Sequence, residues 1–264
     1  FTETVRYAKL GEIHPIPRAT LHIYDAVDYA PNAWNVPLAG YGGEVDPQLQ
    51  ASVNIRQALE AEGILEGLRA LFLVGPGTAH RWHPESKQQS DAFISSVLPR
   101  RPPERVRFVT WTPRYGECYG IRIEALEKQY RRAEVDAARG VIRTKNVARL
   151  ALASEGSVEI DGQKLKGRVF EKRGNRWSTR IDGRLRKRAG LQGPIDDAFM
   201  DSFLCVRPKG GSPELDRFAR EFAKYMRGDI RIKDAEQVTP QDIRDHHLVL
   251  FGDPRNNALI ARIA

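Results

Sequence analysis

One carboxylate and one imidazole each follow a short apolar run in the first third of the chain. Asp46 comes shortly after the run 36–41, and His80 comes shortly after the run 70–74. Both runs are short and end in glycines, as buried parallel strands do. Because the carboxyl ends of neighbouring parallel strands meet at one edge of a sheet, we predict that Asp46 and His80 hydrogen-bond to each other.

An Asp–His pair of this kind has a defined chemistry. The carboxylate holds the imidazole in one tautomer, and the second ring nitrogen can then accept a proton from a hydroxyl nucleophile. His83 is the rival for the base, because it lies only three residues after His80. We favour His80, since it follows the turn-forming segment 75–77 directly.

The element that must position this pair is a strand–helix–strand unit. Between the two apolar runs, residues 47–62 are predicted to form a helix. Its apolar positions are Leu49, Val53, Ile55, Ala58 and Leu59. The runs on either side are then two adjacent parallel strands, with the helix as their connection.

The segments around the pair read GYGGEVDP and GTAHRWHPES. They resemble the last third of an α/β-hydrolase catalytic domain, closest to secreted esterases and prolyl-oligopeptidase-like serine hydrolases. In that family the triad runs in the order Ser, Asp, His. The resemblance implies that Asp46 is the acid and His80 the base. It also implies an ester or peptide substrate, carbohydrate-linked esters included, no cofactor, and an extracellular or periplasmic location.

The chain departs from the family in lacking a nucleophile elbow, the G-x-S-x-G turn between a strand and a helix. In the family this motif would precede Phe1, and the segment 1–4 resembles the region just after the following strand. We therefore expect an internal or C-terminal part of a longer hydrolase. A missing N-terminal portion would supply the serine, and this chain alone would be inactive.

Composition narrows the class of protein. Of the 264 residues, 41% are hydrophobic and 29% charged, which is typical of a globular protein. No apolar run approaches 18 residues, so we expect no membrane span.

The two cysteines, Cys118 and Cys205, lack zinc-ligand spacing, and no metal site is predicted. Cys205 lies in an apolar run and should be buried.

Charge is distributed unevenly along the chain. Residues 100–190 contain 24 Lys and Arg against 11 Asp and Glu, whereas the rest contains 18 against 23. A shift of this size beside the Pro-rich segment 99–103 marks a boundary. A basic module can bind nucleic acid or acidic polysaccharide, but a solvated basic surface is the simpler interpretation, and we do not expect a nucleic-acid partner.

The fold class that follows is α/β. Residues 1–99 are predicted to be the end of an α/β-hydrolase sheet, 100–190 a basic β-rich module, and 191–264 a second small α/β unit that is itself truncated. Within the module we expect a small sandwich, with strands over 105–112, 142–152 and 156–161, a strand then a helix over 121–135, and an Asp161-Gly162 hairpin turn.

Helix-start signals are clearest in the last region. Ser212 and Thr239 each precede a proline and are predicted N-caps, the first of a helix over 213–227 with the apolar stripe Leu215, Phe218, Phe222 and Tyr225. Near the N-terminus, residues 14–17 (HPIP) are predicted to be an extended loop, and Pro31 is predicted to end the apolar segment 21–30.

Three functions from different classes remain at this point. The first is a serine hydrolase that uses Asp46 and His80. The alternative is a non-catalytic binding or assembly protein on a hydrolase scaffold without the nucleophile, and the third, least favoured, is a nucleic-acid binder. The sequence that precedes Phe1 would separate the first two, because a G-x-S-x-G motif there restores the enzyme.

Overall fold

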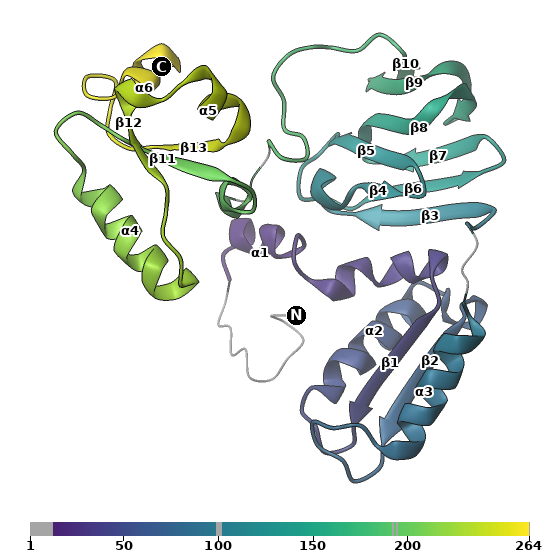
Figure 1. Ribbon diagram of the computed structural model, residues 1–264. Coiled ribbons are helices and arrows are strands. Elements are labelled where there is room, and N and C mark those ends of the chain that lie inside the picture. Colours follow the sequence, from purple (N-terminus) through teal and green to yellow (C-terminus); the bar gives the residue numbers. More distant parts are fainter. Residues whose placement is uncertain (1–12, 99–101, 192, 194, 264) are drawn as a thin grey trace. The chain divides into compact units, whose positions relative to one another are not determined.

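The computed structural model describes residues 13–98, 102–191, 193 and 195–263 (Figure 1). The chain is a mixed α/β protein with three sheets, and it divides into two compact units, 1–189 and 190–264. The predicted segment 1–99 and all but the last residue of the predicted segment 100–190 lie in the first unit. The predicted boundary at 99–103 falls largely outside the described residues, as does the family-like segment 1–4.

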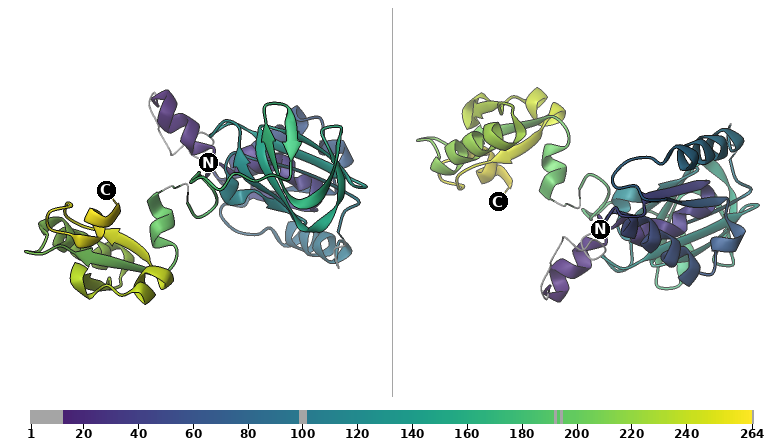
Figure 2. Two further views of the ribbon diagram at one scale, coloured as in Figure 1. Left: turned by 90° about the horizontal axis from the view of Figure 1, so that it is seen from above. Right: turned by 90° about the horizontal axis from the view of Figure 1, so that it is seen from below.

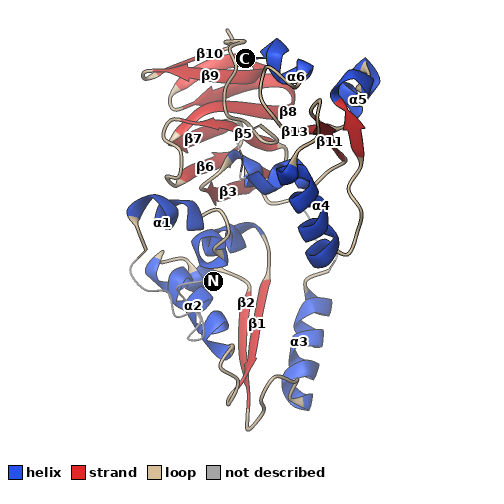
Figure 3. Cartoon of the chain, turned by 90° about the vertical axis from the view of Figure 1, so that its left-hand side faces the viewer, coloured by secondary structure: helices blue, strands red, loops and turns tan. Residues whose placement is uncertain are grey.

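A parallel strand pair forms the first layer of unit 1. Strand β1 (Leu38–Gly43) pairs with β2 (Ala70–Gly75) in register from Leu38↔Ala70 to Gly43↔Gly75. Helix α2 (Leu49–Ala61) and the short 3₁₀ turn η2 (Leu65–Gly67) connect the strands, and α3 (Pro84–Ser96) follows. The two helices flank the strands (Figure 3). The predicted strand–helix–strand unit is confirmed, although β1 begins two residues later than predicted.

The prediction for the N-terminal residues was wrong. Residues 15–21 form helix α1 (Pro15–Leu21), and the 3₁₀ helix η1 (Ala26–Asn35) runs through Pro31. Prolines are tolerated in the first turn of a helix because its N–H groups have no partner within the helix. The ring of His14 supplies an acceptor for the N–H of Ile16.

Two asparagines of η1 attach it to strand β3 (Arg105–Thr110), which ends the strand order of the large sheet. Asn32 accepts from the Val109 N–H at 2.7 Å and donates to the Val109 carbonyl at 3.0 Å. Asn35 does the same for Arg107, whose N–H donates to it at 3.0 Å. Residues two apart on a strand present their N–H and C=O groups on one side, so the two amides imitate a neighbouring strand.

We predict that the double substitution Asn32→Ala/Asn35→Ala lowers the free energy of unfolding by about 2–5 kcal/mol, because four hydrogen bonds to a sheet edge are lost. Urea unfolding followed by tryptophan fluorescence measures the change. Asn175→Ala, in the exposed β9–β10 turn, is the matched control. Equal loss in both variants would show that the asparagines do not hold the edge.

The large sheet of unit 1 has eight strands in the order β10-β9-β8-β7-β6-β3, with β4 and β5 joined through β8. Strand β8 is the longest, and it pairs with β5 along its first half, with β7 at its end and with β9 along both. This sharing curves the sheet until it is nearly closed (Figures 1 and 2). The strands not yet bounded are β4 (Glu117–Cys118), β5 (Ile121–Leu126), β6 (Ala133–Ala138), β7 (Val141–Lys145), β8 (Val147–Ile160), β9 (Gln163–Arg173) and β10 (Arg176–Ser178).

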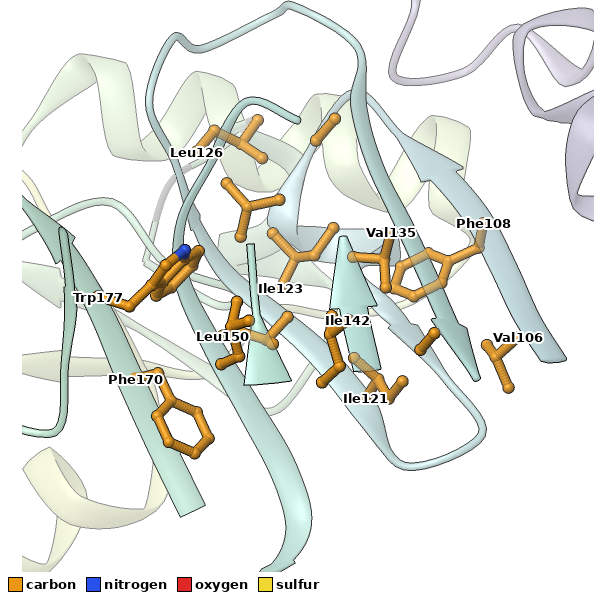
Figure 4. Close-up of a cluster of buried hydrophobic side chains, with 14 residues drawn as sticks. Val106, Phe108, Ile121, Ile123, Leu126, Val135, Ile142, Leu150, Phe170 and Trp177 are labelled. Atoms are coloured by element: carbon orange, nitrogen blue, oxygen red, sulfur yellow. The ribbon is translucent and has the colours of Figure 1, made fainter. Parts of the chain in front are cut away.

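The curved sheet encloses one apolar core (Figure 4). Ile123, Leu150, Ile160 and Phe170 are 0% exposed, and they come from three different strands. Burying such a side chain stabilises the fold by about 1.5–3 kcal/mol. The predicted small sandwich is therefore corrected to a single sheet that wraps around its own core.

Two predicted elements of this sheet differ in detail. Residues 121–135 form strands β5 and β6 rather than a strand and a helix, because Ala133, Val135 and Ala137 alternate into the core. The strand predicted over 142–152 is interrupted at Asn146 (φ 57°), which separates β7 from β8. The side-chain amide of Asn146 donates to two nearby carbonyls. The predicted Asp161-Gly162 hairpin turn is confirmed. Both residues have positive φ (49° and 81°), as a type I′ turn requires.

Unit 2 contains a three-stranded parallel sheet in the order β12-β11-β13. The predicted caps are confirmed: Ser212 accepts from the Leu215 N–H, and Thr239 forms a capping box with Asp242. Tyr225 is 67% exposed, so it does not belong to the predicted stripe. The elements are η4 (Ile195–Phe199), β11 (Phe203–Arg207), α4 (Pro213–Met226), β12 (Ile232–Asp234), η5 (Ala235–Gln237), α5 (Pro240–Asp245), β13 (His247–Leu250) and α6 (Ala258–Ile263).

Candidate functional site

The structure brings Asp46 and His80 together. Strands β1 and β2 end side by side at Gly43 and Gly75, and the two side chains lie three and five residues further on. His80 Nδ1 lies 2.9 Å from Asp46 Oδ2. This confirms the predicted hydrogen bond between residues 34 positions apart.

The hydrogen bond fixes the protonation pattern of the neutral ring. An ionised carboxylate can only accept, so the Nδ1 that faces Asp46 carries the proton, and Nε2 has the free lone pair. The His80 side chain is 77% exposed, whereas that of Asp46 is 9% exposed. Within the described residues Nε2 has no hydrogen-bond partner, so it is available to a group that approaches from solvent.

The second carboxylate oxygen of Asp46 also accepts a hydrogen bond. Oδ1 accepts from the Gln48 N–H at 2.8 Å, at the start of α2. This bond, followed by the one from His80, lowers the pKa of Asp46 from its ordinary value of 3.8. Because the pKa is lowered on folding, ionised Asp46 stabilises the folded state above the unfolded pKa. This contribution is lost as the pH falls through the folded pKa.

We predict that His80→Ala raises the pKa of Asp46 part of the way towards 3.8 and no further, because the Gln48 N–H still donates to the carboxylate. A ¹³C NMR titration of the Asp46 carboxyl carbon measures this shift. His83→Ala is the control and should leave the pKa unchanged. A full return to the ordinary value in His80→Ala would show that His80, not Gln48, dominates the shift.

The loops that carry the pair are tied to each other by backbone hydrogen bonds. The Glu44 N–H donates to the Gly75 carbonyl at 2.9 Å, and the Val45 N–H donates to the Thr78 carbonyl at 3.0 Å. The Glu44 carboxylate accepts from the Gly77 N–H at 2.7 Å. These hydrogen bonds hold the two loops together in addition to the bond between Asp46 and His80.

Tyr41 fixes the far side of the His80 loop, and the sequence alone did not reveal this role. Its hydroxyl donates to the Arg81 carbonyl and accepts from the His83 N–H, both at 2.8 Å. Its ring stacks on Trp82 with centroids 4.1 Å apart. A tyrosine at the end of a strand, followed by glycines, was the only signal available.

The remaining candidates take other positions. His83 is the residue before α3, and its Nδ1 is buried without a hydrogen-bond partner among the described residues, so it is not bonded to Asp46. Ser86 and Ser90 are 5% exposed on α3. None of the described serines hydrogen-bonds to His80.

Other site types find little support in the described residues. They contain no group of His, Cys, Asp or Glu side chains that could hold a metal ion. Cys118 and Cys205 are free thiols, and burial raises the pKa of Cys205 to about 11, as expected for a buried thiol. None of the helices in the described ranges is long and apolar enough to cross a bilayer.

The geometry therefore offers an acid–base pair at the strand ends of a parallel sheet. Such a pair can take a proton from a hydroxyl and return it to a leaving group. Comparisons of this chain with protein-family models, with curated proteins and with solved structures found no match.

Proposed function

We propose that this chain carries the acid and base of a serine hydrolase that cleaves ester or peptide bonds. The observation that carries the proposal is the 2.9 Å contact between Asp46 Oδ2 and His80 Nδ1, with Nε2 facing solvent. Its finer parts, the α/β-hydrolase family and an extracellular or periplasmic location, rest on the resemblance of the GYGGEVDP and GTAHRWHPES segments.

The roles follow from the hydrogen-bonding geometry. Nε2 of His80 accepts the serine proton as the oxygen attacks the substrate carbonyl, and Asp46 stabilises the imidazolium that forms. The same proton then passes to the departing alcohol or amine. Water repeats the sequence on the acyl-enzyme, which releases the acid and restores the serine.

The serine itself belongs, by the family's chain order, to a segment before Asp46 and outside the described residues. A fluorophosphonate probe tests this with the protein expressed from its complete coding sequence. We expect one labelled serine, identified by peptide mass spectrometry, and no labelling in His80→Ala. An unlabelled wild-type protein that is folded would contradict the proposal and favour a non-catalytic scaffold.

A further inference from the structure

Trp82 lies two residues after His80 and exposes a large part of its indole ring. The residue is 47% exposed. Two residues of extended chain span at most about 7 Å, so the indole lies within reach of a molecule that contacts His80. Val45, next to Asp46 on the other loop, is a second exposed apolar side chain, at 63%. Exposed apolar surface therefore accompanies both members of the acid–base pair.

The indole is supported from one side by Tyr41. The two rings stack with centroids 4.1 Å apart and planes 19° from parallel. The Tyr41 hydroxyl is itself fixed, because it donates to the Arg81 carbonyl and accepts from the His83 N–H, and it also lies 3.3 Å from the Thr78 hydroxyl. Since the polar end of Tyr41 is occupied by the loop, the stacked rings present apolar surface to solvent.

A fixed, exposed aromatic ring is well suited to binding. Tyr41 covers one face of the Trp82 indole, so the other face is available to a flat apolar group. Aromatic rings gain from offset stacking in addition to the area that they bury. A ring that is already held in position also loses little conformational freedom when it binds a ligand.

The position of Trp82 beside the base decides which part of a substrate it would contact. In the proposed mechanism, Nε2 of His80 returns its proton to the departing oxygen or nitrogen, which must then lie within hydrogen-bond distance of Nε2. The group attached to that atom therefore lies against the His80 loop. The acyl group, in contrast, is bonded to the serine.

We propose that Trp82 binds the leaving group of the substrate, and that this leaving group is an apolar, preferably aromatic, alcohol or amine. The inference rests on the proposed function and adds to it the class of the departing group. The aromatic ring of the substrate, Trp82 and Tyr41 would then form one continuous stack. Trp82 is a substrate-binding residue in this arrangement and takes no part in proton transfer.

Benzyl acetate and ethyl acetate test the inference in the protein expressed from its complete coding sequence. Both esters form the same acetyl-enzyme and release alcohols of similar acidity, so their values of kcat/KM differ mainly through the binding of the leaving group. We expect Trp82→Ala to lower the benzyl-to-ethyl ratio of kcat/KM about tenfold, because the stacking surface is lost. Trp82→Phe retains an aromatic ring and should retain most of the ratio.

Ile94→Ala is the matched control for the loss of an exposed apolar side chain. Ile94 is 46% exposed and lies ten residues beyond the start of α3, about 15 Å along the helix. Its ratio should equal that of the wild type. A fall in activity by the same factor on both esters in Trp82→Ala would overturn the inference, because Trp82 would then only support the loop that carries His80.

A binding measurement separates the failure of this inference from the failure of the proposed function. With 5-fluorotryptophan incorporated, the ¹⁹F signal of Trp82 is assigned by its absence in Trp82→Phe. It should shift saturably with benzyl alcohol and stay unchanged with the same concentration of ethanol. No shift with benzyl alcohol would overturn the inference and leave the acid–base pair untouched. A protein that binds benzyl alcohol, hydrolyses neither ester and reacts with no fluorophosphonate would overturn the proposed function, and with it the assignment of the bound ring as a leaving group.

Discussion

Replacing His80 with Ala in the proposed hydrolase, expressed from its complete coding sequence, should lower kcat by about 10⁴- to 10⁶-fold, with a small change in KM. The imidazole acts on the proton in the transition state and contributes little to binding the ground-state substrate. Steady-state hydrolysis of p-nitrophenyl acetate and of a peptide anilide measures the loss. The two substrates also separate an esterase from a peptidase.

Two further variants make this result specific to the pair. Asp46→Asn keeps the shape of the side chain but no longer provides a charged acceptor for Nδ1–H, so kcat should fall by about 10⁴-fold. His83→Ala removes the neighbouring histidine, whose buried Nδ1 has no hydrogen bond to Asp46, and should retain most of the activity. Activity that survives in His80→Ala but disappears in His83→Ala would show that His83, and not His80, is the base.

The pairing of Asp46 with His80 could be predicted because it depends on a simple rule of topology. Two short apolar runs joined by an amphipathic helix give adjacent parallel strands, and such strands end at the same edge. The small error in the start of β1 did not matter. The sequence correctly predicted that each strand is followed by a loop, and that the loops carry Asp46 and His80.

The contacts that hold the site and the layers together could not be predicted. Asn32 reaches a strand 77 residues away, and nothing in its neighbours distinguishes this role from a turn or helix cap. Tyr41 likewise acts through the backbone of Arg81 and His83. Roles of this kind exist only after the chain has folded, so local pattern carries no signal for them.

The failures in secondary structure have two different causes. Residues 14–17 and Pro31 were interpreted from proline alone, yet proline is compatible with the first turn of α1 and with a short 3₁₀ helix. Residues 121–135 carry charges at helical spacing, but burial of every second side chain decides for strands. Only in the second case did the tertiary environment outweigh a local preference.

Gly43 is the residue of the site region that the structure leaves least room to change. A Cβ added there would lie 2.2 Å from the Ala79 carbonyl oxygen and 2.3 Å from that of Thr78, far inside any normal contact. Both obstacles are backbone atoms, so a side-chain rotation cannot relieve the clash. The φ of Gly43 is not positive, so the effect of a substitution comes from this contact and not from backbone conformation.

We therefore expect Gly43→Ala to lower the free energy of unfolding by about 3 kcal/mol, because an overpacked site forces the backbone to shift. Thr78 and Ala79 immediately precede His80, so the shift should also move the imidazole away from Asp46. In the proposed hydrolase, a displacement of the imidazole by about 1 Å would lower kcat by roughly 10²-fold. Urea unfolding and the pKa of Asp46, which should rise as the bond from His80 is lost, report the two effects separately.

Gly67→Ala is the matched control, since an added Cβ there meets no atom within 4 Å and the φ of Gly67 is also not positive. Its stability should stay within about 0.5 kcal/mol of the wild type. Equal stability of the two variants would mean that the Thr78–Ala79 segment can move aside at little cost. The loop that carries His80 would then be held by its hydrogen bonds with Tyr41 and with residues 44–46, and not by its close packing against Gly43.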